Sequence, residues 1–151
     1  MQDFIRKGAL AGALVASSLI ATSASAEPGI DLENKTVTIG AFTPVTGPVP
    51  FYATLTHAAE AYFNRLNETG EVDGWTFNYI TKDDGYDPAR SVAASRTLVE
   101  DDEIFALSAP IGTATNVAVI PYVKETGVPL IGPVGGSSQF FVEPAIFPLL
   151  P

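Results

Sequence analysis

The sequence has no cysteine among its 151 residues. This absence excludes disulfide bonds, thiolate sites for zinc or iron–sulfur clusters, and a cysteine nucleophile. It also excludes a lipid-modified cysteine at the start of a mature chain. The fold must therefore be held together by packing and by hydrogen bonds alone.

Basic residues and histidine are also scarce. Eight Lys and Arg residues stand against 17 Asp and Glu residues, which gives a formal net charge of −9. So acidic a chain is a poor match for a nucleic-acid-binding protein, which neutralises phosphates with Lys and Arg. His57 is the only histidine, and because it lies off the apolar stripe of its expected helix we assign it to the surface.

The common signatures of enzymes are missing. With no cysteine and one histidine, a hydrolase set would have to combine His57 with a Ser or an Asp. The sequence contains no G-x-S-x-G elbow, no G-x-G-x-x-G fingerprint and no Walker A loop. Catalysis by paired carboxylates stays open, although no pattern points to it. We therefore expect a protein that is not an enzyme and that has no cofactor and no metal.

The chain is rich in apolar residues, which make up 46% of it and argue against intrinsic disorder. Its N-terminus has the three parts of a secretory signal: the basic pair Arg6 and Lys7, an apolar run over residues 8–22, and the cleavage sequence Ala24-Ser25-Ala26. The alternative is a membrane anchor, but the run is shorter than the ~20 residues that cross a bilayer. We expect a signal peptide over residues 1–26, a periplasmic protein, and no membrane span in the mature chain.

The rest of the chain alternates short apolar strands with helices. The patterns predict strands over 36–42, 75–82, 104–109 and 128–132, with a fifth near 145–150, and helices over 51–68, 87–102 and 113–125. Pro121 predicts a kink in the last helix or a late start of it. This order indicates an α/β fold, an open parallel sheet with helices on both faces.

The last residues, Leu149-Leu150-Pro151, belong to an apolar run with no closing helix or polar cap. An edge strand and an uncovered sheet face would invite aggregation. We therefore expect residues 27–151 to be the N-terminal part of a larger domain. The alternative is a small complete domain of flavodoxin-like size.

In an open parallel sheet, ligands bind at the carboxyl ends of the strands. Four loops follow strands here, over residues 43–52, 83–87, 110–115 and 133–138. The last two are rich in Gly, Ser and Thr, so their backbone N–H groups and hydroxyls suit a carboxylate. Asp83, Asp84 and Asp87 do not have the spacing of a calcium loop, and we expect them to act as caps and turn residues.

Four segments of the loops and strands stand out in this order: TGPVPFY (46–52), DDGYDP (83–88), GTAT (112–115) and VPLIGPVGGSS (128–138). Together they resemble the type I periplasmic binding proteins, and in particular the leucine/isoleucine/valine-binding proteins of ABC transporters. The resemblance runs from Lys35 to Pro151. It implies a Rossmann-like first lobe, of which this chain supplies only part, with the second lobe absent.

The resemblance also implies a ligand site. By position, Tyr52 matches a tyrosine that lines the cleft, Thr113 a Ser or Thr that binds the ligand carboxylate, and Val134 a residue that contacts the head group through its backbone. Gly136 stands where the family commonly has Ser or Thr, so either Ser137 or Ser138 supplies a hydroxyl or backbone N–H groups act alone. The expected ligand-binding residues are Tyr52, Thr113, Ala114, Val134, Gly135, Gly136 and Ser137.

The function that the resemblance implies is that of an extracytoplasmic receptor. Such a protein closes two lobes on an amino acid or a related carboxylate or amide and delivers it to an ABC permease in the inner membrane. Two alternatives stay open: the ligand-binding domain of a sensor with the same fold, and a small secreted enzyme. The departure at Gly136 also leaves aromatic acids, amides and urea open as ligands.

Overall fold

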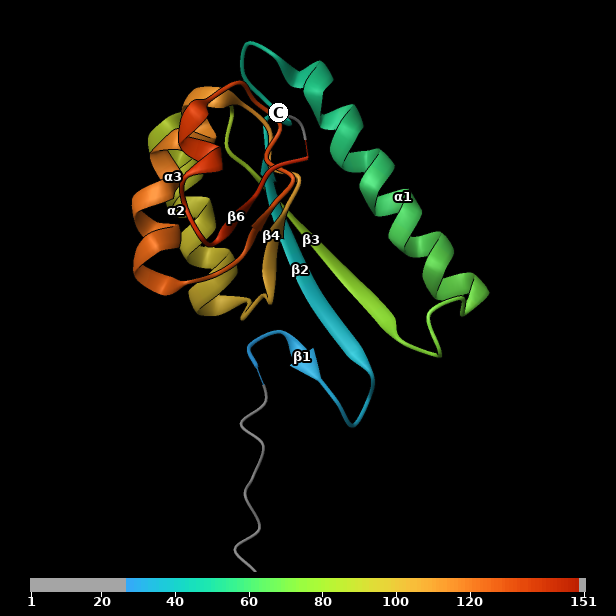
Figure 1. The fold of residues 1–151 in the computed structure, drawn as a ribbon. Helices are drawn as coiled ribbons and strands as arrows, with labels where there is room; N and C mark the ends of the chain where they lie inside the picture. Colours follow the sequence, from blue (N-terminus) through green and yellow to red (C-terminus); the bar gives the residue numbers. More distant parts are fainter. Residues whose placement is uncertain (1–26, 150–151) are drawn as a thin grey trace, which may run out of the picture.

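The computed structural model describes residues 27–149 (Figure 1). The predicted signal peptide and its cleavage site after Ala26 lie outside these residues. In chain order the elements are β1 (Ile30–Asp31), β2 (Thr36–Thr43), the 3₁₀ turn η1 (Pro50–Tyr52), α1 (Ala53–Thr69), β3 (Thr76–Asp83), α2 (Pro88–Arg96), the π-helical turn η2 (Thr97–Asp101), β4 (Ala106–Ser108), α3 (Thr113–Thr126), β5 (Leu130–Ile131), the 3₁₀ turn η3 (Ser138–Phe141) and β6 (Ile146–Phe147). The alternation of strands and helices predicted from the sequence is confirmed.

The strands form one sheet in which five run parallel, in the spatial order β3-β2-β4-β5-β6. β2 and β3 pair along their whole length, from Thr36 opposite Thr76 to Thr43 opposite Asp83. The short β1 is antiparallel to the start of β2 and was not predicted, because two residues are too few to show a pattern. The α/β class and the open parallel sheet are confirmed.

Helices cover both faces of the sheet. Figure 1 shows α2 and α3 together on one face and α1 alone on the other. The core lies between the sheet and the α2–α3 pair, where the strands contribute Phe42, Leu107 and Leu130 and the helices contribute Leu98, Val119 and Val123. Within residues 27–149, no helix combines the length and apolar character needed to cross a membrane.

Only part of the apolar stripe that the sequence suggests for the first helix is buried; its members are Leu55, Ala58, Ala59, Tyr62, Phe63 and Leu66. Leu66 is buried and the Phe63 ring packs against Phe77 and Tyr79 of β3, whereas Leu55 and Tyr62 are 50% and 56% exposed. Ala53 and Thr56, outside the stripe, are also buried. The helix is attached to β3 by a side chain off that stripe: the Asn67 amide donates to the Phe77 carbonyl at 2.9 Å and accepts from its N–H at 2.8 Å. The apolar spacing was right for a helix, but the hydrogen bonds of Asn67 help to set its rotation.

The face predicted for the second helix is also buried only in part, at Val92 and Val99, which pack against the core. The sequence groups Ala89, Val92, Ala93, Arg96 and Val99 on one face, but Ala89, Ala93 and Arg96 are exposed. The fully buried side chains of α2 are Ser91 and Ser95, and the Ser95 hydroxyl donates to the Ser91 carbonyl at 2.9 Å. A serine that bonds to its own helix can be buried, and its small size lets α2 pack closely.

The N-terminus of α2 lies where the sequence predicts it. Asp87 caps α2, since its carboxylate accepts from the N–H groups of Ala89 and Arg90 at 2.8 and 2.9 Å, with Pro88 in the first turn as predicted.

α3 begins at Thr113, so the late start suggested by Pro121 is wrong. Proline inside α3 removes one backbone donor, and the rest of the helix remains continuous.

Candidate ligand-binding site

The site forms where β4 turns into α3. Gly112 precedes the helix with φ +116°, a conformation that side-chain-bearing residues rarely adopt. Two fully buried side chains hold this turn: Thr115 Oγ1 donates to the Ile111 carbonyl at 2.8 Å, and Asn116 Nδ2 donates to the Pro110 and Gly112 carbonyls at 3.0 and 2.7 Å. The carbonyls of the turn are thereby satisfied, and the N–H groups of the first helical turn are left for a ligand.

The loop after β5 packs directly on this helix start. The N–H of Gly136 donates to Thr113 Oγ1 at 3.0 Å. A Cβ on Gly135 would lie only 3.0 Å from both Thr113 Cα and Thr113 Oγ1, so a larger residue would push the loop or Thr113 away by a few tenths of an ångström. Because Gly136 already donates to the Thr113 oxygen, the hydroxyl proton of Thr113 is available to an anion.

Val134 joins the same two loops through its backbone. Its N–H donates to the Pro110 carbonyl at 2.9 Å, and its carbonyl accepts from the Gly112 N–H at 2.8 Å. These bonds continue the sheet beyond its named strands, as a bridge between Ile111 and Val134. The N–H of Val134 is thus engaged within the protein, and the residue itself is 38% exposed at the cleft.

Two tyrosines close the site on its other side. The rings of Tyr52 and Tyr86 are stacked with centroids 6.3 Å apart and planes 26° apart. They line a cavity of about 140 Å³, whose other lining residues are Ile111, Gly112, Thr113, Val134 and Gly135. Sequence reasoning missed Tyr86, Ile111 and Gly112 as lining residues, although all three lie in the loops that it singled out.

The structure brings together most of the predicted ligand residues. Tyr52, Thr113, Val134 and Gly135 line one cavity, and Gly136 is bonded to Thr113. Ala114 follows Thr113 in the first turn of α3 and is exposed. Ser137 does not line this cavity; its hydroxyl accepts from the Gln139 N–H at 3.3 Å and caps η3.

Asp83, at the end of β3, organises the loop that carries Tyr52. Its carboxylate accepts from the N–H groups of Val45, Thr46 and Gly85 at 2.9–3.0 Å, from the Thr46 hydroxyl at 2.6 Å, and from the Arg90 guanidinium at 2.9 Å. Burial alone would raise the pKa of this carboxyl, but the hydrogen bonds from Thr46, Gly85 and Arg90 hold the pKa well below its usual range. Asp83 is therefore a charged anchor that fixes one loop against another.

Asp84 differs from Asp83 in that it is fully buried and its pKa is shifted in the opposite direction. Its side chain accepts from the Tyr86 N–H at 2.9 Å and from the Ser91 hydroxyl at 2.8 Å. Burial raises the pKa of Asp84, and these hydrogen bonds offset only part of that effect. The aspartates of this loop are thus structural: Asp83 anchors, Asp84 holds Tyr86, and Asp87 caps α2.

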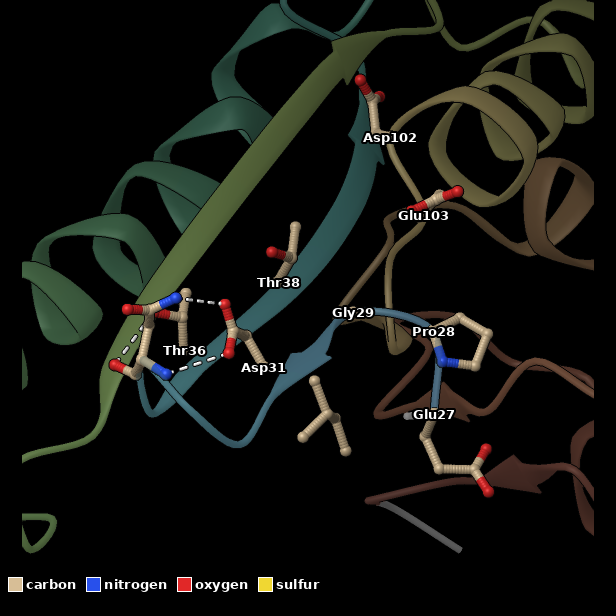
Figure 2. Close-up of a pocket in the computed structure, with 10 residues that line it drawn as sticks. Glu27, Pro28, Gly29, Asp31, Thr36, Thr38, Asp102 and Glu103 are labelled. Atoms are coloured by element: carbon tan, nitrogen blue, oxygen red, sulfur yellow. Dashed lines mark hydrogen bonds between the residues drawn. The ribbon is translucent and has the colours of Figure 1, made fainter. Parts of the chain in front are cut away.

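A larger cavity, of about 490 Å³, lies at the other end of the strands (Figure 2). Its acidic lining residues are Glu27, Asp31, Asp102 and Glu103. Two of these carboxylates have local partners, since Asp31 accepts from Asn34 and Asp102 pairs with Lys82 at 2.9 Å. Among residues 27–149, no group of three or more acidic or histidine side chains is placed to hold a metal ion.

A family model described as periplasmic binding protein matches residues 36–151. The chain belongs to this family. The match covers all four loops of the site, and it confirms the resemblance to type I periplasmic binding proteins that the sequence suggests.

Known proteins are similar to this periplasmic binding protein in sequence or in fold. It is 28% identical over 117 residues to the Leu/Ile/Val-binding protein BraC3 of Rhizobium johnstonii, a match that covers 77% of this chain and 32% of the relative. A possible leucine/isoleucine/valine-binding protein from Rhodopirellula baltica has a TM-score of 0.72 at 24% identity, over 78% of this chain and 32% of that chain. A substrate-binding periplasmic protein from Ralstonia solanacearum has a TM-score of 0.69 at 28% identity, over 74% and 32%. The chain spans about a third of the length of these relatives.

Proposed function

We propose that this periplasmic binding protein is a solute receptor rather than an enzyme, and that its ligand is an amino acid or a related small carboxylate. The observation that carries the proposal is the convergence of Tyr52, Thr113 and Gly135 on one cavity at the start of α3. The relatives named above are described as leucine/isoleucine/valine-binding or substrate-binding proteins, which supports the same ligand class.

The geometry suits a carboxylate in three ways. The positive end of the α3 dipole and the N–H groups of its first turn favour negative charge. The Thr113 hydroxyl has its oxygen occupied by Gly136 and its proton free. The nearby aromatic pair, Tyr52 and Tyr86, offers an apolar surface for the rest of the ligand.

The wider assignment rests on the family and on the N-terminal sequence. We propose export by the predicted signal peptide, cleavage after Ala26, and a second lobe that closes over the ligand. Closure would complete the cavity, which one lobe leaves open, and would present the loaded receptor to an ABC permease. Contacts from the second lobe would choose among ligand side chains.

The test is to measure binding of L-leucine, L-phenylalanine and benzoate to the full-length mature protein by isothermal titration calorimetry. Thr113→Ala should weaken binding of every carboxylate that the wild type binds, by about 10- to 100-fold, the usual loss for a hydrogen bond to a charged group. Thr113→Ser keeps the hydroxyl and should bind within a few-fold of the wild type.

The matched control is Thr126→Ala, which removes a threonine from the exposed last turn of the same helix. It should leave all affinities unchanged. A Thr113→Ala protein that is folded and binds its carboxylate as tightly as the wild type would show that the carboxylate is held elsewhere.

A further inference from the structure

We infer that Tyr86 contacts the ligand and that, together with Tyr52, it selects ligands with a planar aromatic group next to the carboxylate. The inference rests on the proposed receptor function and deepens it, because it names the ligand class for this site. Tyr86 lies in the Asp84–Asp87 turn, in one of the four strand-end loops, but the sequence assigned a role there only to the aspartates, as caps and turn residues.

The position of Tyr86 is fixed by its backbone. The residue has φ +62°, in the left-handed region that residues other than glycine rarely enter. Its N–H donates to Asp84 Oδ1 at 2.9 Å, and the Asp84 side chain is fully buried. The Asp87 N–H donates to the Asp84 carbonyl at 3.0 Å and closes the turn. A left-handed backbone conformation is unfavourable for tyrosine, and here the buried Asp84 carboxylate stabilises it. Such conformations are often found at functional sites.

The turn directs the Tyr86 ring onto the start of α3. A Cβ on residue 112 would lie 2.7 Å from Tyr86 Cε2, so the ring rests against the bare α carbon of Gly112. Gly112 immediately precedes Thr113, the residue proposed to bind the carboxylate. The ring therefore lies beside the position of the ligand head group, on a surface that only glycine leaves open.

Tyr52 and Tyr86 together form an aromatic wall of the cavity. The two rings are nearly parallel, with centroids 6.3 Å apart, and both line the cavity of about 140 Å³. Flat π systems gain from offset stacking on such rings beyond the burial of area, whereas a branched aliphatic body gains only from burial. A planar carboxylate can keep its anionic end at Thr113 while its ring lies along this wall.

The experiment compares benzoate as the flat probe with L-leucine as the branched probe on the full-length mature protein, by calorimetry. The wild type should bind benzoate. Tyr86→Leu should weaken benzoate by about 2- to 12-fold, the equivalent of one aromatic pair, and leave L-leucine unchanged or tighter. Tyr86→Phe keeps the ring and should bind benzoate within about twofold of the wild type.

Thermal unfolding should show that each variant is folded. If Tyr86→Leu does not fold, Tyr86→Asn replaces it, because Asn tolerates the left-handed backbone better. Equal weakening of both probes by the ring-free variant, or the same loss in Tyr86→Phe, would overturn the role of the Tyr86 ring.

The behaviour of the wild type separates this inference from the proposed function. A wild type that binds L-leucine but not benzoate overturns the selection of a flat body and leaves the receptor function standing. A wild type that binds neither probe nor L-phenylalanine overturns both.

Discussion

At the scale of single residues, Asp84 is the most informative side chain. The Ser91 hydroxyl lies 2.8 Å from Asp84 Oδ2 and also 2.8 Å from the Asp87 carbonyl, yet it has only one proton. If Asp84 is ionised, both neighbours of Ser91 are acceptors and one contact lacks a proton. If Asp84 is protonated, its O–H donates to Ser91, and Ser91 donates to Asp87. Protonation of Asp84 would therefore complete this network, and burial raises the pKa of Asp84 in the direction that favours the proton.

This network predicts the effect of Asp84→Asn. The amide supplies the donor toward Ser91 and keeps the acceptor for the Tyr86 N–H, without a buried charge. We expect the free energy of unfolding near pH 7 to stay within about 1 kcal/mol of the wild type or to rise. Urea unfolding of the full-length protein measures it.

The pH dependence follows from the direction of the pKa shift. Since folding raises the pKa of Asp84, the folded state binds this proton more tightly than the unfolded state. The wild type therefore gains stability from this residue as the pH falls through the folded pKa, and the gain levels off below the unfolded value of about 3.9. Asp84→Asn should lack this contribution, while Asp101→Asn, at an exposed carboxylate, should follow the wild type. A loss above about 2 kcal/mol in Asp84→Asn at pH 7 would mean that the ionised carboxylate is needed.

The sequence identifies some site residues and not others for a physical reason. Thr113 and Gly135 were predicted because they lie in strand-end loops rich in Gly, Ser and Thr, and because the family resemblance assigns Thr113 a role by position. Tyr86 could not, because nothing in DDGYDP shows that a tyrosine takes the left-handed conformation. The engagement of the Val134 N–H with Pro110 depends on pairing between two loops, which only the folded chain shows.

At the scale of elements, the type and order of helices and strands could be predicted, but the buried helix faces could be predicted only in part. Periodicity counts apolar residues, whereas α2 buries Ser91 and Ser95 and exposes Ala89 and Ala93. The helix N-cap at Asp87 was predictable because capping is a local interaction of neighbouring residues. The faces were predictable only in part, because they depend on partners that are distant in the sequence.

Helix α1 gives a test at this scale. The Asn67 amide forms two hydrogen bonds with the backbone of Phe77 in β3, at 2.8 and 2.9 Å, and thereby attaches the helix to the sheet. Asn67→Ala should lower the free energy of unfolding by about 1–3 kcal/mol, because it leaves both backbone groups of Phe77 unpaired at that edge. Urea unfolding measures this value, and hydrogen exchange should report faster opening of α1.

The matched control for this test is Asn64→Ala, one turn earlier on the exposed side of the same helix. Alanine is the better helix former, so Asn64→Ala should be neutral or slightly stabilising. Equal stabilities for the two variants would show that the Asn67 bonds contribute no net free energy to the docking of α1.

At the scale of the whole molecule, the covering of the two sheet faces is unequal. The face under α2 and α3 is closed, whereas apolar side chains are exposed on α1, on β5 and β6, and just after β6. These are Leu55, Tyr62, Ile131, Phe147 and Leu149, which are 50%, 56%, 38%, 53% and 75% exposed. Among residues 27–149, β6 pairs only with β5, and apolar surface of this kind beside a strand edge favours association.

This surface predicts how residues 27–151 behave when they are expressed alone. We expect them to self-associate and to unfold without a sharp transition, because apolar side chains on α1, β5 and β6 gain more from contact with another chain than from water. Sedimentation velocity over a range of concentrations and a thermal melt followed by circular dichroism measure both properties. The pair Phe147→Lys and Leu149→Lys should shift the distribution toward monomer, while Val72→Lys, at an exposed apolar residue in the turn after α1, should not. A monomeric wild-type segment with a cooperative melt would show instead that the α2–α3 core is sufficient, and that the exposed face is tolerated as ordinary protein surface.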